Sequence, residues 1–377
     1  MARRSETDRW LFSITLMLCL LGAVMIFSAS AVTAEQRFGH SYYFSLRQAL
    51  WLIAGLLGMF ALMKLDYHRL REPAVVYTAL CLVLLMLVGT FFLDKSHATH
   101  RWLKLGPAQI QPSELAKLAV ILYLGWFLDS RRRSKSSLEF RKEDLMQTIL
   151  PAVGPILVCV ALIVSQPDLG TSVDIVLIMT AILFAAGLSW KWLVVGAASA
   201  IPVLFVLITQ VSYRQARIMA FLHPESDPQG AGFQLTQSLI AVGSGGFTGV
   251  GLMESKQKLF YLPEAHTDFI YAVICEELGF IGAVIVIALF TAYAWRGLRA
   301  AFNAPDGFGR MLALGATAMV LFQALINFAV VLGMMPTKGI PLPFVSYGGS
   351  SLLAMLLATG VLLNVAQQGS GNASVRA

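Results

Sequence analysis

A polar loop gives way to a long apolar run within residues 261–295, which read YLPEAHTDFIYAVICEELGFIGAVIVIALFTAYAW. The apolar part, residues 269–295, is long enough to cross the hydrocarbon core of a bilayer as an α-helix, which takes about 20 residues. Asp268 lies where the loop ends, so we expect its carboxylate at the lipid headgroup boundary, where a membrane enzyme could meet the polar end of a lipid-linked substrate. The alternative is structural: Thr267 and Asp268 would cap the start of the helix, and the acid would complement the helix dipole.

The composition of the whole chain points to the same class of protein. Of its 377 residues, 57% are hydrophobic and only 13% are charged, whereas soluble domains carry about 25% charged residues. About ten apolar runs are long enough to span a bilayer, at residues 11–33, 48–63, 74–93, 114–128, 147–165, 170–187, 191–209, 269–295, 310–333 and 345–366. We therefore predict an all-α polytopic membrane protein that forms a single domain over residues 1–377.

The distribution of lysine and arginine predicts how the chain is oriented in the membrane. If the N-terminal tail, residues 1–10, is cytoplasmic, the cytoplasmic loops carry more positive charge than the longer loops on the other side. These cytoplasmic loops would be residues 64–73, 129–146, 188–191 and 296–310. The C-terminal tail, 368–377, would also be cytoplasmic, and the largest outer loop, 210–267, would join the seventh and eighth spans. We thus predict a multi-pass protein of the cytoplasmic (inner) membrane with an active side that faces the periplasm or the extracellular space.

Charge and cysteine content exclude several other classes. The net charge of +7 follows from the basic loops, which act as an insertion signal and attract anionic lipid, so no nucleic-acid partner is predicted. The first apolar run resembles a signal peptide, but further spans follow at once and we expect it to remain as the first helix. The four cysteines have no metal-ligand spacing, and we predict neither a metal site nor a disulfide from Cys19, Cys81, Cys159 and Cys275.

The first polar cluster of the predicted outer side ends the loop before the fourth span, at residues 100–117, HRWLKLGPAQIQPSELAK. It places Arg101 near the membrane interface and starts a helix at Pro112. Glu114 and Lys117 lie three residues apart on one helix face and can pair. A lysine within an apolar span is costly unless it is paired or functional, but one this close to the helix start could also extend to the headgroups.

The second cluster lies in the large outer loop, where residues 230–251 read GAGFQLTQSLIAVGSGGFTGVG. This amphipathic, glycine-rich stretch is typical of an interfacial or re-entrant segment over a cavity, and the alternative is a flexible exposed loop. Further along the chain, the adjacent acids Glu276 and Glu277 would lie deeper in the eighth span, where we expect them to anchor neighbouring helices or water.

The third cluster is KGIPLPFVSYGGSS, residues 338–351, ahead of the last span. Pro341 and Pro343 prevent a regular helix, and residues 348–351 then start one. A glycine-rich helix start presents free N–H groups to an anion, but small residues equally allow close helix packing, which the local sequence favours.

Five stretches together resemble the SEDS family of shape, elongation, division and sporulation proteins. They are RWLKLG and QPSELAK within 101–117, QPDLGTS at 166–172, DPQGAGFQLTQSLIAVGSGG at 227–246, YLPEAHTDFIYAVICEELG at 261–279 and KGIPLPFVSYGGSS at 338–351. The stretches follow the order and spacing of the family over residues 10–368. The residues at 258–259, 264–266 and 343–344 are more similar to the cell-division branch of the family, FtsW, than to the elongation branch, RodA.

The resemblance implies a peptidoglycan glycosyltransferase that polymerises lipid II on the outer face of the cytoplasmic membrane. The donor would be a growing glycan on undecaprenyl diphosphate, and the acceptor would be the 4-hydroxyl of the N-acetylglucosamine in lipid II. The essential aspartate of the family falls on Asp268, as general base, and its arginine, glutamate and lysine motif falls on Arg101, Glu114 and Lys117. To substrate binding we also assign the neighbouring residues His266, Ser346, Gly348, Gly349 and Ser350.

The resemblance also implies partners: a class B penicillin-binding protein, which is a transpeptidase with one membrane span, and other membrane proteins of the division apparatus. No cofactor is firmly implied; a divalent cation (Mg²⁺ or Mn²⁺) could bridge the diphosphate, but the sequence shows no ligand set for it. Three alternatives remain open from the sequence: an elongation polymerase similar to RodA, a lipid II flippase, and a non-catalytic scaffold for division enzymes.

Overall fold

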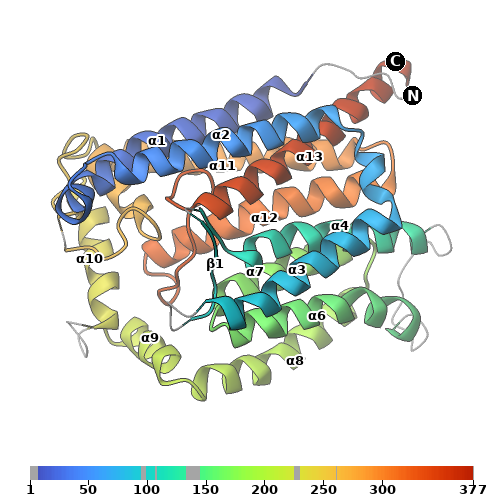
Figure 1. Ribbon diagram of the computed structural model, residues 1–377, viewed down its shortest axis with the longest axis horizontal. Helices are drawn as coiled ribbons and strands as arrows, with labels where there is room; N and C mark the ends of the chain where they lie inside the picture. The colour runs from blue at the N-terminus through green and yellow to red at the C-terminus, as the bar shows by residue number, and fades with distance from the viewer. Residues whose placement is uncertain are drawn as a thin grey trace.

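The computed structural model describes residues 7–94, 99–106, 108–132, 145–224, 230–259 and 261–376, and within them the chain forms an α-helical bundle (Figure 1). The helices are α1 (Arg9–Phe38), α2 (Tyr43–Lys64), α3 (Pro73–Leu93), α4 (Pro112–Arg132), α6 (Leu150–Ser165), α7 (Leu169–Ala185), α8 (Trp190–Thr209), α9 (Ser212–Leu222), α10 (Ala231–Ser244), α11 (Ile270–Phe302), α12 (Gly307–Val331) and α13 (Gly349–Arg376). Short helical turns lie at η1 (Tyr67–Arg71) and η2 (Leu145–Ile149), and the strands β1 (Leu103–Leu105) and β2 (Ala108–Ile110) form an antiparallel hairpin.

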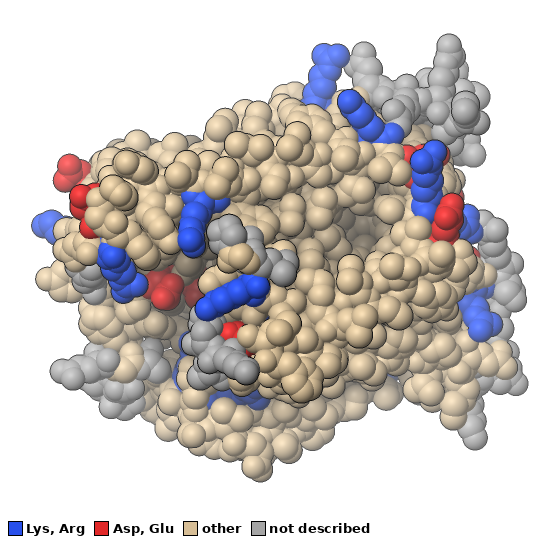
Figure 2. Space-filling view, in the orientation of Figure 1, with Lys and Arg blue, Asp and Glu red and all other residues tan. Residues whose placement is uncertain are grey.

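The predicted all-α polytopic fold is confirmed. Each of the ten predicted spans coincides with a helix, and within the described residues eight helices, with η2 and α6 taken as one, are long and apolar enough to cross a membrane. The other two are α7, which is apolar but shorter, and α4, which carries charged residues at both ends. On the face shown in Figure 2, charged side chains gather toward the two ends and leave a largely uncharged band between them. Such a band is what a bilayer requires of the residues that face it.

The helices differ widely in how deeply they are buried. Helices α12 and α13 form the centre, with 72% of their apolar windows buried, whereas none of the corresponding window of α8 is buried. Helix α8 lies at the edge of the bundle beside α9 (Figure 1). The start of α1 and the end of α13 lie at one end of the bundle, as an even number of spans requires, and α2, α11 and α13 begin toward the other end (Figure 1). The assignment of the terminal end to the cytoplasm remains a prediction.

Helix α11 is kinked at Gly279, and the segment 246–251 that follows α10 fills the break. Gly279 has a φ of 64°, a left-handed conformation that interrupts the helical hydrogen bonds. Four backbone hydrogen bonds of 2.9–3.2 Å bridge the break, from Val250 to Glu276, Gly251 to Glu277, Phe280 to Gly246 and Ile281 to Phe247. Residues 230–251 therefore form a short helix and a turn, and the turn hydrogen-bonds with α11 at the kink. An interfacial or re-entrant position of this stretch in the membrane remains a prediction.

A buried ion pair ties the loop between α10 and α11 to the bundle. Lys258 Nζ lies 2.7 Å from Glu277 Oε1, and the two side chains are 4% and 0% exposed. The hydroxyl of Ser28 on α1 donates to the same carboxylate at 2.6 Å. The adjacent Glu276 accepts a hydrogen bond from the hydroxyl of Ser255. These contacts confirm the expectation that the two acids of α11 anchor neighbouring elements.

Some predicted features lie outside the described residues. They are the basic part of the predicted cytoplasmic loop, at 133–144, a piece of the large outer loop, at 225–229, and the first six residues of the N-terminal tail.

Candidate active site

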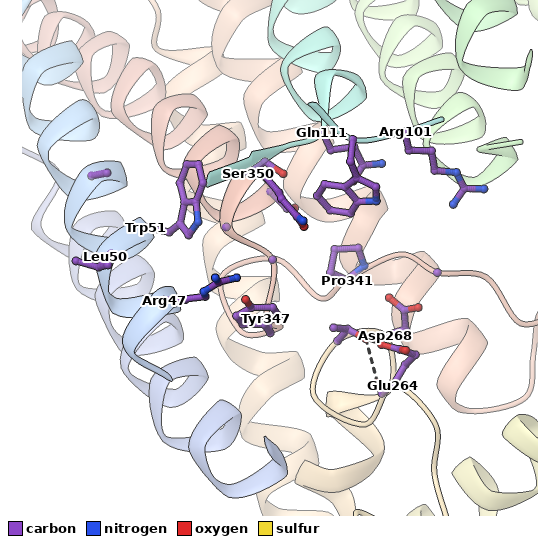
Figure 3. Close-up of a pocket in the computed structure, with 18 residues that line it drawn as sticks. Arg47, Leu50, Trp51, Arg101, Gln111, Glu264, Asp268, Pro341, Tyr347 and Ser350 are labelled. Atoms are coloured by element: carbon purple, nitrogen blue, oxygen red, sulfur yellow. Dashed lines mark hydrogen bonds between the residues drawn. The ribbon is translucent and has the colours of Figure 1, made fainter. Parts of the chain in front are cut away.

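An open cavity of about 580 Å³ lies where α2, α11 and α13 begin (Figure 3). It is lined by Arg47, Leu50, Trp51 and Ala54 of α2, by Arg101, Trp102, Gln109 and Gln111 ahead of α4, by Glu264, Thr267 and Asp268 ahead of α11, and by Gly339, Pro341 and residues 347–351, which lead into α13. Segments distant in the sequence therefore meet at one recess. Of the predicted site residues, the cavity brings together Asp268, Arg101, Gly348, Gly349 and Ser350.

Asp268 lies in the turn before α11 and does not cap the helix. The helix begins at Ile270, and its N-cap position is Phe269, which makes no side-chain capping hydrogen bond. The capping alternative is therefore wrong, because the carboxylate points into the cavity instead (Figure 3). The backbone on both sides of the cavity is fixed by Asn327 of α12, whose amide donates at 2.8 Å to the carbonyls of Asp268 and Ile340.

The carboxylate of Asp268 has an unusual pKa for an aspartate. Burial is the main cause and, with the negative charge of Glu264, raises its pKa from 3.8 to about 7, although Arg217 and Arg101 act in the opposite direction. Gly339 lies directly beside the carboxylate, since a Cβ built there would be 2.9 Å from Asp268 Oδ2. A carboxylate that is half ionised near neutral pH and open to a cavity is suited to act as a general base.

The cations near Asp268 are held by backbone carbonyls. Arg101 donates through Nε to the carbonyl of Gln166 at 3.0 Å and through Nη2 to that of Pro167, so it is fixed against the turn between α6 and α7. Arg217 of α9 donates through Nη1 to the carbonyl of Thr337 at 3.0 Å. Because carbonyls leave these guanidinium charges unneutralised, the Asp268 side of the cavity is suited to an anion.

Glu114 and Lys117 pair as predicted, but they lie behind the cavity wall and not on it. Lys117 Nζ is 3.0 Å from Glu114 Oε2 and 3.3 Å from Asp174 Oδ2, and its side chain is 1% exposed, so it does not extend to the headgroups. It also donates at 2.5 Å to Gln323 of α12. The amide of Gln323 in turn donates to the carbonyl of Pro341 at 2.9 Å. The pair thus reaches the cavity through Gln323, and its predicted contact with substrate remains a prediction.

His266 and Ser346 likewise shape the wall without lining the cavity. The ring of His266 packs against Phe44 with centroids 4.7 Å apart, its carbonyl accepts from the N–H of Tyr347 at 2.9 Å, and burial lowers its pKa. Ser346 accepts a hydrogen bond from the N–H of Leu342 at 2.8 Å. Both residues hold the segment that leads into α13.

The glycines at the start of α13 serve close packing. A Cβ at Gly349 would lie 2.2 Å from Nε1 of Trp51, so only glycine lets α13 approach α2 at this point. The first turn of α13 nevertheless lines the cavity, and the first N–H groups of a helix have no partner within it. The glycine-rich start of α13 therefore allows close helix packing and also presents N–H groups to the cavity, so the two interpretations of this motif are compatible.

Sequence reasoning missed several polar residues around the cavity. Asp174, Gln323 and Asn327 carry the same signal that singled out Lys117, because each is a polar residue within an apolar span. Arg47 and Glu264 carry no such signal, since each lies at the edge of a loop where charged residues are ordinary.

No group of three or more His, Cys, Asp or Glu side chains that could hold a metal ion occurs among the described residues. The cavity offers two carboxylates, Asp268 and Glu264. Mg²⁺ is commonly held by one or two carboxylates together with substrate phosphates, so these two residues would hold such an ion if the substrate brought one.

A second cavity, of about 160 Å³, lies between α2, η1, α4, α12 and α13. All its lining side chains are apolar: Leu62, Leu70, Leu118, Ile121, Leu122, Leu312, Ala316, Leu357, Ala358 and Val361.

The fold and the site define a polytopic membrane protein whose open cavity combines an aspartate of raised pKa with the guanidinium groups of Arg47 and Arg101. Its sequence matches the family model described as cell cycle protein, FtsW/RodA/SpoVE, over residues 9–371, and the chain belongs to this family.

Relatives with curated names match over nearly the whole chain. A probable peptidoglycan glycosyltransferase FtsW of Trichlorobacter lovleyi is 42% identical, over 96% of this chain and 94% of the relative. Stage V sporulation protein E of Bacillus subtilis is 41% identical, over 97% of this chain and 98% of the relative.

Solved structures share the fold. A chain of a peptidoglycan synthase complex, from a study of its polymerization and crosslinking, is 31% identical with a TM-score of 0.77, over 96% of this chain and 98% of that one. The rod shape determining protein RodA of Thermus thermophilus is 29% identical with a TM-score of 0.69, over 96% of each chain.

Proposed function

We propose that this chain is a peptidoglycan glycosyltransferase that polymerises lipid II, with Asp268 as its general base. The proposal rests above all on the position of Asp268, whose carboxylate has a pKa of about 7 and lines a cavity shared with Arg101. A base of this pKa is half ionised at neutral pH, and a nearby cation can offset charge that develops on a diphosphate. Family relatives named as probable peptidoglycan glycosyltransferases support the reaction type.

In the proposed reaction, the carboxylate of Asp268 takes the proton from the 4-hydroxyl of N-acetylglucosamine in lipid II as that oxygen attacks C1 of the donor sugar. The bond between C1 and the donor diphosphate breaks, and its electron pair leaves with undecaprenyl diphosphate. Arg101, fixed by the carbonyls of Gln166 and Pro167, offsets the charge of that leaving group. The buried pair of Glu114 and Lys117 acts indirectly, because it holds the segment ahead of α13 through Gln323.

The cavity would open to the outer face of the cytoplasmic membrane, where lipid II presents its sugars. This orientation is supported by the excess of lysine and arginine in the loops at the opposite end. We further propose that the chain works with a class B penicillin-binding protein, as its similarity to a chain of a peptidoglycan synthase complex suggests. The identities of 40–42% to relatives named FtsW favour a role in septal wall synthesis over elongation.

A lipid II flippase would need a polar path through the bundle. The second cavity, which lies between α4 and α12, the helices that carry Lys117 and Gln323, is lined only by apolar side chains, so this part of the described chain disfavours that alternative.

The decisive experiment uses the purified full chain in liposomes with labelled lipid II, with and without its transpeptidase partner. Asp268→Asn should abolish glycan chains while abundance and partner binding stay unchanged. Glu254→Gln is the matched control, since Glu254 is an exposed acid of the same loop that does not line the cavity. Polymer made by Asp268→Asn at the rate of the parent chain would refute the role of Asp268 as the base.

A further inference from the structure

The face of α2 that lines the cavity carries a cation, Arg47, that is not paired with a carboxylate of the described residues. Arg47, Leu50, Trp51 and Ala54 follow one another at positions i, i+3, i+4 and i+7, so they share one side of the helix. Among the residues that the structure describes, no carboxylate forms an ion pair with Arg47. The guanidinium instead lies 4.6 Å from the ring centroid of Tyr43 and on the same side of the cavity as Tyr347, with which it interacts electrostatically (Figure 3).

The surroundings of Arg47 add positive potential. It lies in the second turn of α2, whose first turn contains no acid, so it adds to the positive end of that helix dipole. The first turn of α13 lines the same cavity, and its glycine packs on Trp51, one turn along α2 from Arg47. A positive site without a neutralising acid, at the level where the helices begin, is suited to an anion such as a diphosphate.

Further along α2 from Arg47, away from the start of the helix, the exposed surface is apolar. Leu50, which lines the cavity, is 61% exposed, and Ile53, three residues further along the helix, is 57% exposed. A cation near the helix start, followed by exposed apolar side chains further along the helix, matches a lipid-linked diphosphate. The cation would meet the charged diphosphate, and the apolar side chains would meet the isoprenoid chain. A free diphosphate would use the cation alone.

The two cationic sides of the cavity differ in their position relative to Asp268. Figure 3 shows Arg47 with Trp51 and Tyr347 on one side, and Asp268, Glu264 and Arg101 on the other. Arg101 is close enough to Asp268 to lower the pKa of that acid, whereas Arg47 is not among the largest influences on that pKa. The cavity therefore has one cation near the base and another across from it.

We propose that Arg47 binds the diphosphate of the acceptor lipid, which makes the α2 face a second anion subsite; this inference rests on the proposed function. The acceptor hydroxyl is on the outer sugar of lipid II, two sugar rings from its diphosphate. When that hydroxyl is at Asp268, the diphosphate must lie well away from it. The donor diphosphate, in contrast, is bonded to the carbon under attack and must lie close to Asp268, on the side of Arg101.

A binding measurement tests the subsite without turnover. The chain with Asp268→Asn is placed in lipid nanodiscs and titrated with lipid II, alone or combined with Arg47→Gln, Arg47→Lys or Arg37→Gln. Arg37 is an exposed arginine near the end of α1 that does not line the cavity, so it is the matched control. We expect Arg47→Gln to weaken binding by about tenfold or more, because charge-assisted hydrogen bonds are lost, and Arg47→Lys to recover part of it. Melting temperatures measured in parallel identify variants that do not fold.

A kinetic measurement assigns the subsite to the acceptor. In the chain with Asp268 intact, lipid-linked glycan is held at saturation as donor while lipid II is varied, and then the two roles are exchanged. Arg47→Gln should raise KM for the acceptor about tenfold with little change in kcat and in KM for the donor. Inorganic diphosphate should compete poorly with lipid II, whereas undecaprenyl diphosphate should compete well.

Several outcomes would overturn the proposal. They are lipid II binding by Arg47→Gln that equals binding by Arg37→Gln, a rise in KM for the donor alone, and equal competition by inorganic diphosphate. If the parent chain makes no glycan at all, the proposed function fails in the kinetic measurement, while the binding measurement still decides whether Arg47 holds lipid II.

Discussion

Lowering the pH from 8 to 6 should slow glycan synthesis about tenfold through protonation of a single group. With a pKa of about 7, Asp268 is about nine-tenths ionised at pH 8 and about one-tenth ionised at pH 6. Only the ionised carboxylate can accept the proton of the attacking hydroxyl. An aspartate with the ordinary pKa of 3.8 would remain ionised over this range, and the rate would not change for this reason.

The neighbours of Asp268 make the test specific. Glu264→Gln removes a negative charge that raises the pKa of Asp268, so the midpoint of the pH–rate profile should move to lower pH. Arg217→Gln removes a positive charge that lowers the same pKa, so the midpoint should move to higher pH. Glu254→Gln, which changes an exposed acid away from the cavity, should leave the midpoint where it is.

The assay is the initial rate of lipid II polymerisation in liposomes at subsaturating lipid II, measured between pH 5.5 and 8.5 for the parent chain and the three variants. Protonation of Asp268 itself does not unfold the chain at low pH, because a carboxylate whose pKa is raised in the folded state stabilises the fold most at low pH. The reasoning is refuted by a flat profile for the parent chain, or by midpoints of the Glu264→Gln and Arg217→Gln variants that move in the same direction.

Three further predictions concern stability, measured by thermal unfolding in detergent. Lys258→Met should destabilise the chain by about 3–5 kcal/mol, because it leaves the carboxylate of Glu277 buried and unpaired. The double variant that also carries Glu277→Gln should recover most of that loss. Equal losses in the single and double variants would contradict the ion-pair argument. Gly279→Ala should lower the melting temperature strongly, because the residue has a φ of 64° and a Cβ there would lie 2.3 Å from the backbone nitrogen of Gly249. The control is Gly154→Ala, which should be neutral or stabilising, because no atom lies within 4 Å of a Cβ built at Gly154. Asp268→Asn should stabilise the chain relative to the parent, and this difference should grow as pH rises from 4 to 7, to at most about 4 kcal/mol. The reason is that ionising Asp268 in the folded state costs about 1.4 kcal/mol for each unit by which its pKa is raised. A stability difference that does not change with pH would show that the pKa of Asp268 is not raised.

The membrane spans could be predicted because apolar length is a local property of the sequence. Ten runs were expected and each coincides with a helix, including α4, whose interior lysine lowers its average hydropathy. The pairing of Glu114 with Lys117 was also predictable, since a spacing of three residues fixes their relation on any helix. The convergence of Asp268 and Arg101 on one cavity came from the resemblance to a family and not from the residues alone.

The uncapped turn ahead of α11 could not be predicted, because it depends on contacts between distant segments. Apolar character begins at Phe269, and local rules place a cap just before it, yet Asn327 of another helix holds the carbonyl of Asp268 and keeps this turn out of the helix. The kink at Gly279 is equally non-local. A lone glycine in an apolar helix carries no signal, and the break is stabilised only by backbone groups of the segment 246–251.

An acid with a pKa near 7 requires a rigid setting, because a mobile turn would move its carboxylate into water and restore an ordinary pKa. The structure supplies that rigidity from both ends of the loop before α11. Lys258 and Glu277 fix the loop ten residues ahead of Asp268, and Asn327 fixes the carbonyl of Asp268 itself. The opposite wall is fixed by Gln323, which joins the buried Lys117 to the segment ahead of α13. The buried polar residues of the spans therefore hold the two walls of one cavity in register, which explains why polar groups outside the cavity lining occur so deep among apolar helices.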